Sequence, residues 1–542
     1  FKDLNRIVEV NIPEGVISIG NHAFSGCESL EKITIPESIV DIGDYAFYLC
    51  TYLPNIDLPN GLETIGDYAF QRCVLIETIN IPETVKEIGK GAFKYCTKLA
   101  NIKFPEGITR INDSVFEGCK ELSQFTIPDG VIYIGDSAFK ECSLRELILP
   151  KDVEKIGDYA FASNVYLSNM ELPDGIDKIS NGLFSGCHNL ESVKMPAGIK
   201  SIEDEAFGGC GKLQRIVIPE NTTSIGNRAF SWCFDLVSVI FNDNLITIGD
   251  EAFSSCRSLT RVIIPESVTV IGDGVFYECT SLENVKLSNN IINIGDELFS
   301  GCKNLSEIKI PEKVTSIGNS AFRNCYNLTV VNIPDSVISI GEGAFKNCTG
   351  LSEISIPMSV SDVQWNSFEG CINLVSVNLP EGILNIQGRA FKDCINLTNI
   401  NIPESVIFIE HGAFENCSSL EKLTIHNVEM YFASTTFNGC DNLTIYSYEG
   451  SEIERYAKDY GINFVSIGYT VYFEIPGRYD LSFSIGVLEN DLIPVPEDPK
   501  VGGYTFLGWY KDRELTILWD FEKDRVNSII TIFANMDMIN IE

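Results

Sequence analysis

Apolar and polar residues alternate along this chain in short runs that return at a fixed interval of 23 residues. In the repeat at 30–50, LEKITIPESIVDIGDYAFYLC, the alternating start LEKITI is typical of a half-buried strand. Pro36 ends that strand because proline has no backbone N–H to donate. The apolar pair Ile39 and Ile42 then predicts a short return segment, and a turn that buries Phe47 closes the repeat.

The phenylalanine of this turn marks the period through most of the chain. It occurs at nineteen positions: Phe24, Phe47, Phe70, Phe93, Phe116, Phe139, Phe161, Phe184, Phe207, Phe230, Phe253, Phe276, Phe299, Phe322, Phe345, Phe368, Phe391, Phe414 and Phe437. Phe161 arrives one residue early, and the missing residue lies in ECSLREL at 141–147. Because so short a repeat cannot bury its own apolar side, it must stack on its neighbours. The pattern therefore predicts a repeat solenoid whose strands form one long parallel sheet.

A different pattern begins after Leu443. Ser451 and Glu454 form a capping box and Gly461 is a helix stop, which together predict a short helix at 452–460. The residues expected to cover the last open repeat are Ile453, Tyr456, Ala457 and Tyr460. A solenoid needs such a cap because its terminal edge would otherwise be exposed.

The breaks in the pattern predict three domains: a solenoid at 1–441, its C-terminal cap at 442–466 and a small β-rich domain at 467–542. We interpret Trp509 and Trp519 as core residues of the last domain, because a domain this small needs large side chains to stabilise it. No cap precedes the first repeat, so we expect the array to extend before residue 1. A secretion signal and an anchor are expected outside these residues.

The acidic composition narrows the possible partners. The net charge is −35 with a pI near 4.5, which argues against nucleic acid, because binding phosphate requires a basic surface. It argues equally against docking on anionic lipid. No run approaches the roughly 18 apolar residues of a membrane-spanning helix. We therefore expect neither a nucleic-acid partner nor membrane insertion.

Cysteine has one fixed place in the repeat. All eighteen cysteines lie three residues after the repeat phenylalanine, and Asn164 occupies the nineteenth place. An asparagine in this place indicates a small side chain that hydrogen-bonds the turn backbone. Zinc is not expected because the sequence has no C-x-x-C and no cluster of cysteine and histidine.

Disulfides between neighbouring repeats are an alternative, because the cysteines before and after Asn164 are even in number and the spacing of rungs is allowed. Stacked side chains are parallel and about 4.8 Å apart, which is wide for a relaxed disulfide. We therefore predict buried, reduced thiols.

The glycine of the Ile-Gly pair is a preference only, because other residues replace it, so the turn cannot require a positive φ. The replacements are Asn112, Ser180, Glu203, Gln364, Gln387, Glu410 and Ala433.

The repeat resembles the BspA-like class of leucine-rich repeats, whose hallmark is a 23-residue unit with I-G-x-x-A-F-x-x-C. The resemblance covers roughly residues 1–441. It implies a right-handed array with a parallel concave sheet and short turns or strands on the convex side, and a role in bacterial surface adhesion. Residues 469–536 contain GYTFLGWY at 503–510, WDF at 519–521 and an expected strand at 531–534. In these features they are similar to the internalin-type B repeat, a small β-grasp-like module of Gram-positive surface proteins. Two departures from that module are EIPGR in the first turn and Met536 in place of a tryptophan.

No catalytic signature stands out. The four histidines, His22, His188, His411 and His426, occupy different places in the repeat. We therefore expect no enzyme, no cofactor and no metal site, although weak calcium binding by acidic loops stays open. We predict an extracellular, monomeric cell-surface module that binds a protein or a glycan of a host or microbe through its concave face. The alternatives are a passive stalk or display scaffold in the cell envelope, and a surface protein of a eukaryotic parasite.

One place in the predicted strand identifies a candidate binding site. The residue between the two buried strand positions must point to the open concave face. It is polar in most repeats but aliphatic at Val217, Ile240 and Ile263. The neighbouring outward place holds Arg215, Ser238 and Arg261. We predict that these six residues contact a partner. The alternatives are that β-branched residues simply suit strands or that a loop covers them.

Overall fold

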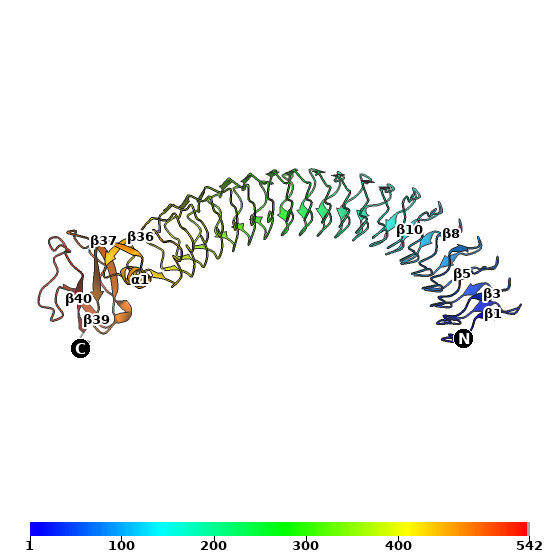
Figure 1. The fold of residues 1–542 in the computed structure, drawn as a ribbon, viewed down its shortest axis with the longest axis horizontal. Helices are drawn as coiled ribbons and strands as arrows, with labels where there is room; N and C mark the ends of the chain where they lie inside the picture. Colours follow the sequence, from blue (N-terminus) through cyan, green and yellow to red (C-terminus); the bar gives the residue numbers. More distant parts are fainter. Residues whose placement is uncertain (539–542) are drawn as a thin grey trace. The chain divides into compact units, whose positions relative to one another are not determined.

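A computed structural model describes residues 1–538, which divide into two compact units (Figure 1). The first unit runs from Phe1 to Leu305 and the second begins at Ser306. Both are built from stacked turns, or rungs, and each rung corresponds to one sequence repeat. Most rungs have a face strand, usually of three residues, and a return strand of two residues. The predicted repeat solenoid is confirmed.

The first unit contains ten face strands, which lie on the inner side of its curve (Figure 1). They are β1 Glu9–Asn11, β3 Lys32–Thr34, β6 Thr78–Asn80, β8 Asn101–Lys103, β12 Asn169–Glu171, β14 Ser192–Lys194, β16 Arg215–Val217, β18 Ser238–Ile240, β20 Arg261–Ile263 and β22 Asn284–Lys286. Its return strands are β2 Ser18–Ile19, β4 Asp41–Ile42, β5 Thr64–Ile65, β7 Glu87–Ile88, β9 Arg110–Ile111, β10 Tyr133–Ile134, β11 Lys155–Ile156, β13 Lys178–Ile179, β15 Ser201–Ile202, β17 Ser224–Ile225, β19 Thr247–Ile248, β21 Val270–Ile271 and β23 Asn293–Ile294.

Neighbouring strands pair in parallel and one repeat apart, so Val217 lies opposite Ile240. The expected single sheet is nevertheless divided into short ladders, such as β16 with β18 and β20 with β22. A strand of three residues can form few hydrogen bonds on each side, so a small shift between rungs is enough to end a ladder. The side chains still alternate as predicted: Ile216 is buried between the exposed Arg215 and Val217.

The core is a set of ladders of identical residues. Phenylalanine rings of successive rungs stack, with centroids 5.4 Å apart for Phe24 and Phe47 and 5.0 Å apart for Phe207 and Phe230. Offset stacking at this distance is favourable, and each ring also buries a large apolar area. The missing residue widens the ladder only slightly, to 6.1 Å between Phe139 and Phe161.

The Ile-Gly glycine has an ordinary backbone, which confirms that its turn does not require a positive φ. A side chain at Gly66 would instead lie 2.6 Å from the backbone of Gly43, because adjacent rungs approach closely there. The left-handed residues lie elsewhere, two before and two after the phenylalanine, as at Tyr45 with φ 54° and Leu49 with φ 61°. Two reversals per rung therefore shape the turn, and side chains of many kinds occupy them.

The cysteine thiols donate hydrogen bonds to backbone carbonyls of the preceding rung. All eighteen are buried free thiols, as predicted. The Cys50 thiol donates to the Phe24 carbonyl over 3.3 Å, and the same bond recurs from rung to rung. Desolvation by burial raises the pKa of Cys50 from 9.0 to about 12. Since the thiolate is the reactive form, burial makes the Cys50 thiol unreactive at neutral pH.

Asn164 fulfils the same role with more hydrogen bonds. Its amide nitrogen donates to the carbonyls of Phe139 and Phe161 at 2.8 and 2.9 Å. Its carbonyl oxygen accepts from the Leu144 backbone N–H at 3.1 Å. The rung with the missing residue thus has an extra donor to satisfy, and asparagine can satisfy it where cysteine cannot.

The second unit continues with the same kind of rungs. Its face strands are β24 Glu307–Lys309, β26 Val330–Asn332, β28 Glu353–Ser355, β30 Ser376–Asn378, β32 Asn399–Ile400, β34 Lys422–Thr424 and β36 Thr444–Glu449. Its return strands are β25 Ser316–Ile317, β27 Ser339–Ile340, β29 Asp362–Val363, β31 Asn385–Ile386, β33 Phe408–Ile409 and β35 Tyr431–Phe432. The remaining elements are α1 Glu452–Tyr460, β37 Asn463–Glu474, the 3-10 helix η1 Tyr479–Leu481, β38 Phe483–Leu488, β39 Tyr504–Tyr510 and β40 Ile530–Met538.

Helix α1 has the predicted bounds and caps. The Ser451 hydroxyl accepts from the Glu454 backbone N–H at 3.2 Å, and Gly461 is left-handed with φ 69°. Ile453, Tyr456 and Ala457 are buried, as expected of a cap. Tyr460 differs from the expectation: it is 50% exposed, because it lies in the last turn and only stacks on the Tyr456 ring.

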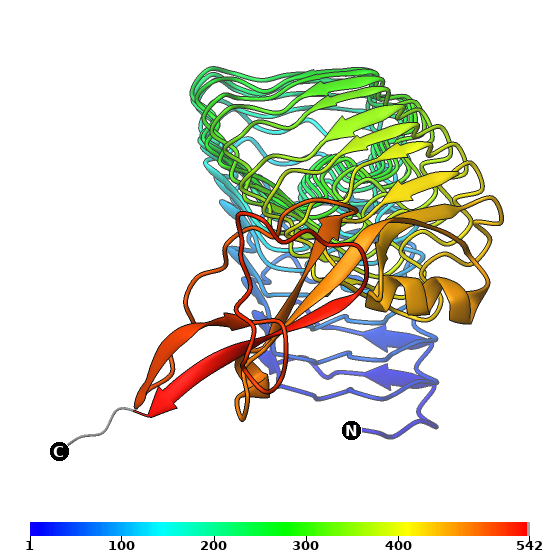
Figure 2. The same ribbon diagram turned by 90° about the vertical axis from the view of Figure 1, so that its left-hand side faces the viewer.

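Strand β37 joins the last rung to the small domain without a linker (Figure 2). Its first residues pair in parallel with β36, and its later residues pair with β38 and β40. The expected domain boundary at 466/467 falls inside this strand. The Ser484 backbone N–H of the small domain also donates to the Glu429 carboxylate of the array at 2.6 Å.

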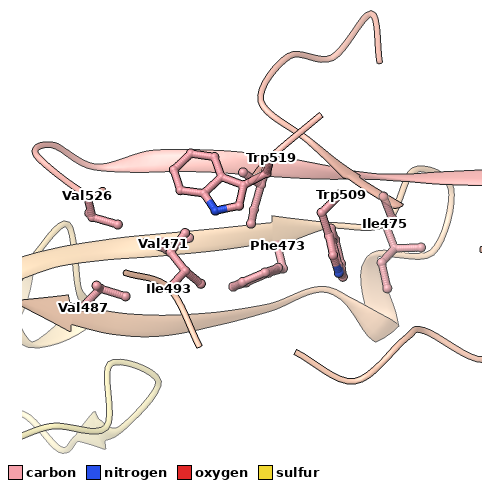
Figure 3. Close-up of a cluster of buried hydrophobic side chains, with 10 residues drawn as sticks. Val471, Phe473, Ile475, Val487, Ile493, Trp509, Trp519 and Val526 are labelled. Atoms are coloured by element: carbon pink, nitrogen blue, oxygen red, sulfur yellow. The ribbon is translucent and has the colours of Figure 1, made fainter. Parts of the chain in front are cut away.

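The small domain has the expected β-grasp-like sheet. Its strand order is β38-β37-β40-β39, with the central pair parallel and the outer pairs antiparallel. Trp509 and Trp519 are buried against Val471 and Phe473, which confirms them as core residues (Figure 3). Met536 packs partly buried against the same core, so this departure from the resembled module is accommodated.

Candidate functional site

The predicted site lies on three consecutive face strands of the first unit. We call Arg215, Val217, Ser238, Ile240, Arg261 and Ile263 the central patch. They are the first and third residues of β16, β18 and β20, so alternation directs them away from the core. The middle residue of each strand faces inward: Ile216 and Val262 are buried, and Val239 is half-buried.

The three aliphatic side chains of the patch reach solvent. Val217 is 51% exposed, Ile240 42% and Ile263 48%, so no loop of the described residues covers them. Val217 and Ile240 are direct partners in one ladder. Ile263 begins the next ladder, opposite Lys286. The result is a short apolar stripe that runs across three rungs and ends at a cation.

The polar members of the patch frame this stripe. Arg215 and Arg261 are exposed, and neither forms an ion pair with any residue at 1–538. Ser238 lies between them and opposite Arg215 in the ladder. Unpaired guanidinium groups beside apolar side chains suit a protein interface, where arginine is enriched and can donate several hydrogen bonds.

Sequence reasoning missed an apolar rim beside the patch. Val237 directly precedes β18 and is 50% exposed, and Phe234 and Trp232, at the end of the preceding repeat, are 42% and 57% exposed. The Arg257 guanidinium lies 5.1 Å from the centre of the Phe234 ring. The signal in the sequence was the segment WCFDLV at 232–237, which gathers three exposed apolar residues around one cysteine.

Ile148 was also missed, although it occupies the same place in its repeat as Val217. It is 84% exposed in the rung with the missing residue, where no face strand forms. Grooves of about 690 and 570 Å³ lie on its two sides. Because this repeat lacks one residue, counting from Thr126 at a constant spacing of 23 residues misses Ile148 by one position.

The histidines considered as catalytic or metal-binding candidates contact neighbouring residues of the fold. His188 Nδ1 lies 2.9 Å from the Gly209 carbonyl, His426 Nδ1 3.2 Å from the Tyr448 hydroxyl, and His22 stacks on Tyr45. Residues 1–538 contain no group of three histidine, cysteine, aspartate or glutamate side chains that could hold a metal ion. Within the same residues, no helix is both long enough and apolar enough to cross a membrane.

The comparison with known families decides the identity of the array. The family described as "BspA type Leucine rich repeat region (6 copies)" matches residues 1–123, 109–236, 200–329 and 315–444. The chain belongs to this family. The BspA-type repeats therefore account for the stacked rungs of both units, and their fold and family are those of binding modules rather than of catalytic domains.

The end of this BspA-type chain matches a second family. The pattern described as "Listeria-Bacteroides repeat domain (List_Bact_rpt)" covers residues 469–535. It agrees with the resemblance to the internalin-type repeat and with the sheet of β37 to β40. The two matches together confirm the combination of modules expected from the sequence.

Two solved structures of similar proteins come from bacteria of the genera Bacteroides and Faecalibacterium. A leucine-rich repeat protein from Bacteroides ovatus is 32% identical, with 75% of this chain and 88% of that chain covered and a TM-score of 0.48. A leucine rich cell surface protein from Faecalibacterium prausnitzii is 26% identical, with 63% and 86% covered and a TM-score of 0.34.

The curated relatives are similar over a short segment only. A protein of Evansella cellulosilytica whose name assigns it to the membrane is 36% identical over 72 residues, which is 13% of this chain and 11% of that protein. The chain spans about a tenth of the length of the curated relatives it matches.

Proposed function

We propose that this chain is a non-enzymatic adhesion module of the bacterial cell surface, and that it binds a protein of a host or another microbe through the central patch. The observation that carries the proposal is the change of one strand position from polar to aliphatic on three consecutive rungs. A position exposed to solvent is usually polar, so a cluster of exposed aliphatics is typical of a contact surface.

The composition of the patch favours a protein as its partner. A protein interface combines an apolar centre with a polar rim, and its strongest contacts come from tryptophan, tyrosine and arginine. Here Val217, Ile240 and Ile263 form the centre, and two unpaired arginines border it. The exposed Val237, directly before β18, extends the apolar contact. An acidic partner segment would suit the arginines in a chain that is otherwise strongly negative.

The test compares two triple variants on purified extracellular-matrix proteins and purified surface proteins of other bacteria. The test variant is Val217→Lys, Ile240→Lys and Ile263→Lys. The control is Thr34→Lys, Asn80→Lys and Thr126→Lys, at the same exposed position in other repeats and with the same added charge. We expect the test variant to weaken binding at least tenfold, since truncating an interface anchor costs about 2 kcal/mol or more.

Full binding by the test variant would refute the central patch as the site. Equal loss in both variants would instead indicate a general effect of added positive charge. Circular dichroism checks that both variants fold, which we expect because every substituted side chain is exposed.

A passive stalk or display scaffold is the second candidate function. The continuous strand β37 supports it, because a module joined without a linker is held in a fixed direction. In that case neither triple variant would change any interaction, and shortening the array would alter only the reach of the displayed domain.

A further inference from the structure

The second unit carries a groove of a different chemistry from the central patch. About 810 Å³ of open space lies over the face strands β26, β28, β30, β32 and β34. Its floor includes Asn332, Ser355, Asn378, Asn401 and Thr424, which occupy the same position of five consecutive repeats. We call this surface the amide trough.

The amide trough is polar but nearly uncharged. Among its lining residues, all of which the structure describes, only Glu353 and Lys422 are charged, and their charges are opposite. The same position in the first unit holds charged residues such as Asp57, Lys103 and Lys194. In a chain with 75 acidic and 40 basic residues, this neutral wall of amides and hydroxyls, to which the exposed Val330 adds one aliphatic side chain, disfavours a ligand selected by charge.

Three of the four side-chain amides of the trough are free to bind a ligand, whereas the Asn399 amide donates to the Thr398 hydroxyl at 3.2 Å. Within the described residues, Asn332, Asn378 and Asn401 form no side-chain hydrogen bond, and all three are exposed. Each offers two N–H donors and a carbonyl acceptor, which matches a ligand rich in hydroxyl groups. Asparagines in other positions of the rung behave differently: Asn373, for example, donates to the Thr349 carbonyl at 2.8 Å.

The trough lacks the anchors of a protein interface. No tryptophan, phenylalanine, methionine or arginine lines it, although these residues dominate protein contacts. Its rungs are spaced by about 4.8 Å, which is close to the length of one sugar ring. A linear saccharide lying along the stacking direction would therefore meet one asparagine, serine or threonine position with each successive ring.

The row of polar side chains ends at an aromatic residue. Tyr446 lies opposite Thr424 in the next rung, and it is half-buried. The Lys422 ammonium lies 4.7 Å from the centre of its ring, which fixes the ring orientation. A tyrosine at the end of a polar row supplies an apolar edge for the terminal ring of a saccharide, together with a hydroxyl.

We propose that the amide trough binds a linear, neutral saccharide chain. This inference is independent of the proposed function, because the trough and the central patch lie in different units and share no residue. The volume falls within the roughly 300–1,000 Å³ of small-ligand sites, so the trough can take an oligosaccharide of several rings.

Isothermal titration calorimetry with defined sugars tests the proposal on the full chain. The probes are cellohexaose, chitohexaose and mannohexaose as neutral chains, the matching disaccharides, and a hyaluronan hexasaccharide as an anionic chain. We expect saturable binding of at least one neutral hexasaccharide at millimolar concentrations, with much weaker binding of its disaccharide and of the anionic chain.

Two double variants locate the site. We expect Asn378→Ala with Asn401→Ala to weaken binding about tenfold or more, since each lost hydrogen bond costs about 1 kcal/mol. Asn11→Ala with Asn80→Ala removes the same groups from the same repeat position in the first unit and should leave the affinity unchanged.

The proposal is overturned if no neutral hexasaccharide binds, if the disaccharide binds as tightly as the hexasaccharide, or if the trough variant keeps full affinity. It is also overturned if the trough variant loses binding to a matrix protein while no saccharide binds, because the trough is then a protein interface.

Discussion

Raising the pH above 9 should destabilise the solenoid, because deeply buried cysteines such as Cys187 and Cys233 ionise more easily in the unfolded chain than in the folded one. Burial raises the pKa of Cys187 and of Cys233 from 9.0 to about 12, and it raises the pKa of Cys210 and Cys256 between and beside them. Their folded pKa values therefore exceed the unfolded ones, and the folded state retains more protons between pH 9 and 12. The stability that depends on these thiols is complete below pH 9 and is lost as the pH rises towards 12.

The size of the effect follows from the number of thiols in one cooperative block. Each thiol withdraws about 1.4 kcal/mol of stability for each pH unit above its unfolded pKa. The four thiols named above lie in consecutive rungs that share stacked rings and backbone hydrogen bonds. At pH 10 they together withdraw about 6 kcal/mol, which is comparable to the whole stability of a small domain at roughly 5–15 kcal/mol.

The assay follows circular dichroism and thiolate absorbance together during an alkaline titration. We expect both signals to change in one steep transition, since ionisation requires unfolding. A matched variant with serine in place of Cys187, Cys210, Cys233 and Cys256 keeps a hydroxyl donor for each phenylalanine carbonyl but cannot ionise in this range. Its transition should move to higher pH. Thiolate absorbance from most of the thiols near pH 9 with an intact circular dichroism spectrum would refute the reasoning, and so would an unchanged transition in the serine variant.

Two further predictions concern Asn164 and strand β37. Asn164→Ala should lower the free energy of local unfolding by about 3–5 kcal/mol, because it leaves two carbonyls and the Leu144 N–H without their partner, whereas Cys210→Ala should cost about 1–2 kcal/mol. Hydrogen exchange of the surrounding rungs measures both, and equal costs would contradict the role assigned to the asparagine. Trp509→Ala should accelerate hydrogen exchange in the small domain and also in the last rung at 444–447, because β37 pairs with both. Unchanged exchange at 444–447 would indicate that the two parts unfold separately.

The sequence was sufficient for the fold because the core is the same in every rung. Leucine, isoleucine, phenylalanine and cysteine recur at fixed intervals, so each prediction about one repeat was tested nineteen times within the chain. Asn164 shows how far this reasoning extends: its single departure from cysteine predicted a hydrogen bond to the turn backbone, and the structure contains three hydrogen bonds there.

Details that depend on the approach of neighbouring rungs could not be predicted from the pattern. The division of the face sheet into short ladders depends on small shifts between rungs. The residue types of the repeat do not indicate where these shifts occur. The continuous strand β37 was also missed, because Val465 and Ser466 carry no sign that pairing changes from β36 to β38 and β40. A boundary drawn where the repeat pattern ends therefore fell within one strand.

Exposed positions vary from rung to rung, whereas most core positions hold the same residue type in every rung. Most rungs keep the same buried residues because they must stack, with Asn164 as a buried departure, so differences between rungs are concentrated on the surface. A run of similar departures at one exposed position is therefore more informative than any single residue. Three aliphatics at β16, β18 and β20 form one such run, and the uncharged polar side chains at β26 to β34 form another. The two surfaces differ in chemistry although the backbone beneath them repeats, so one array can present separate sites for an apolar protein surface and for a polar chain.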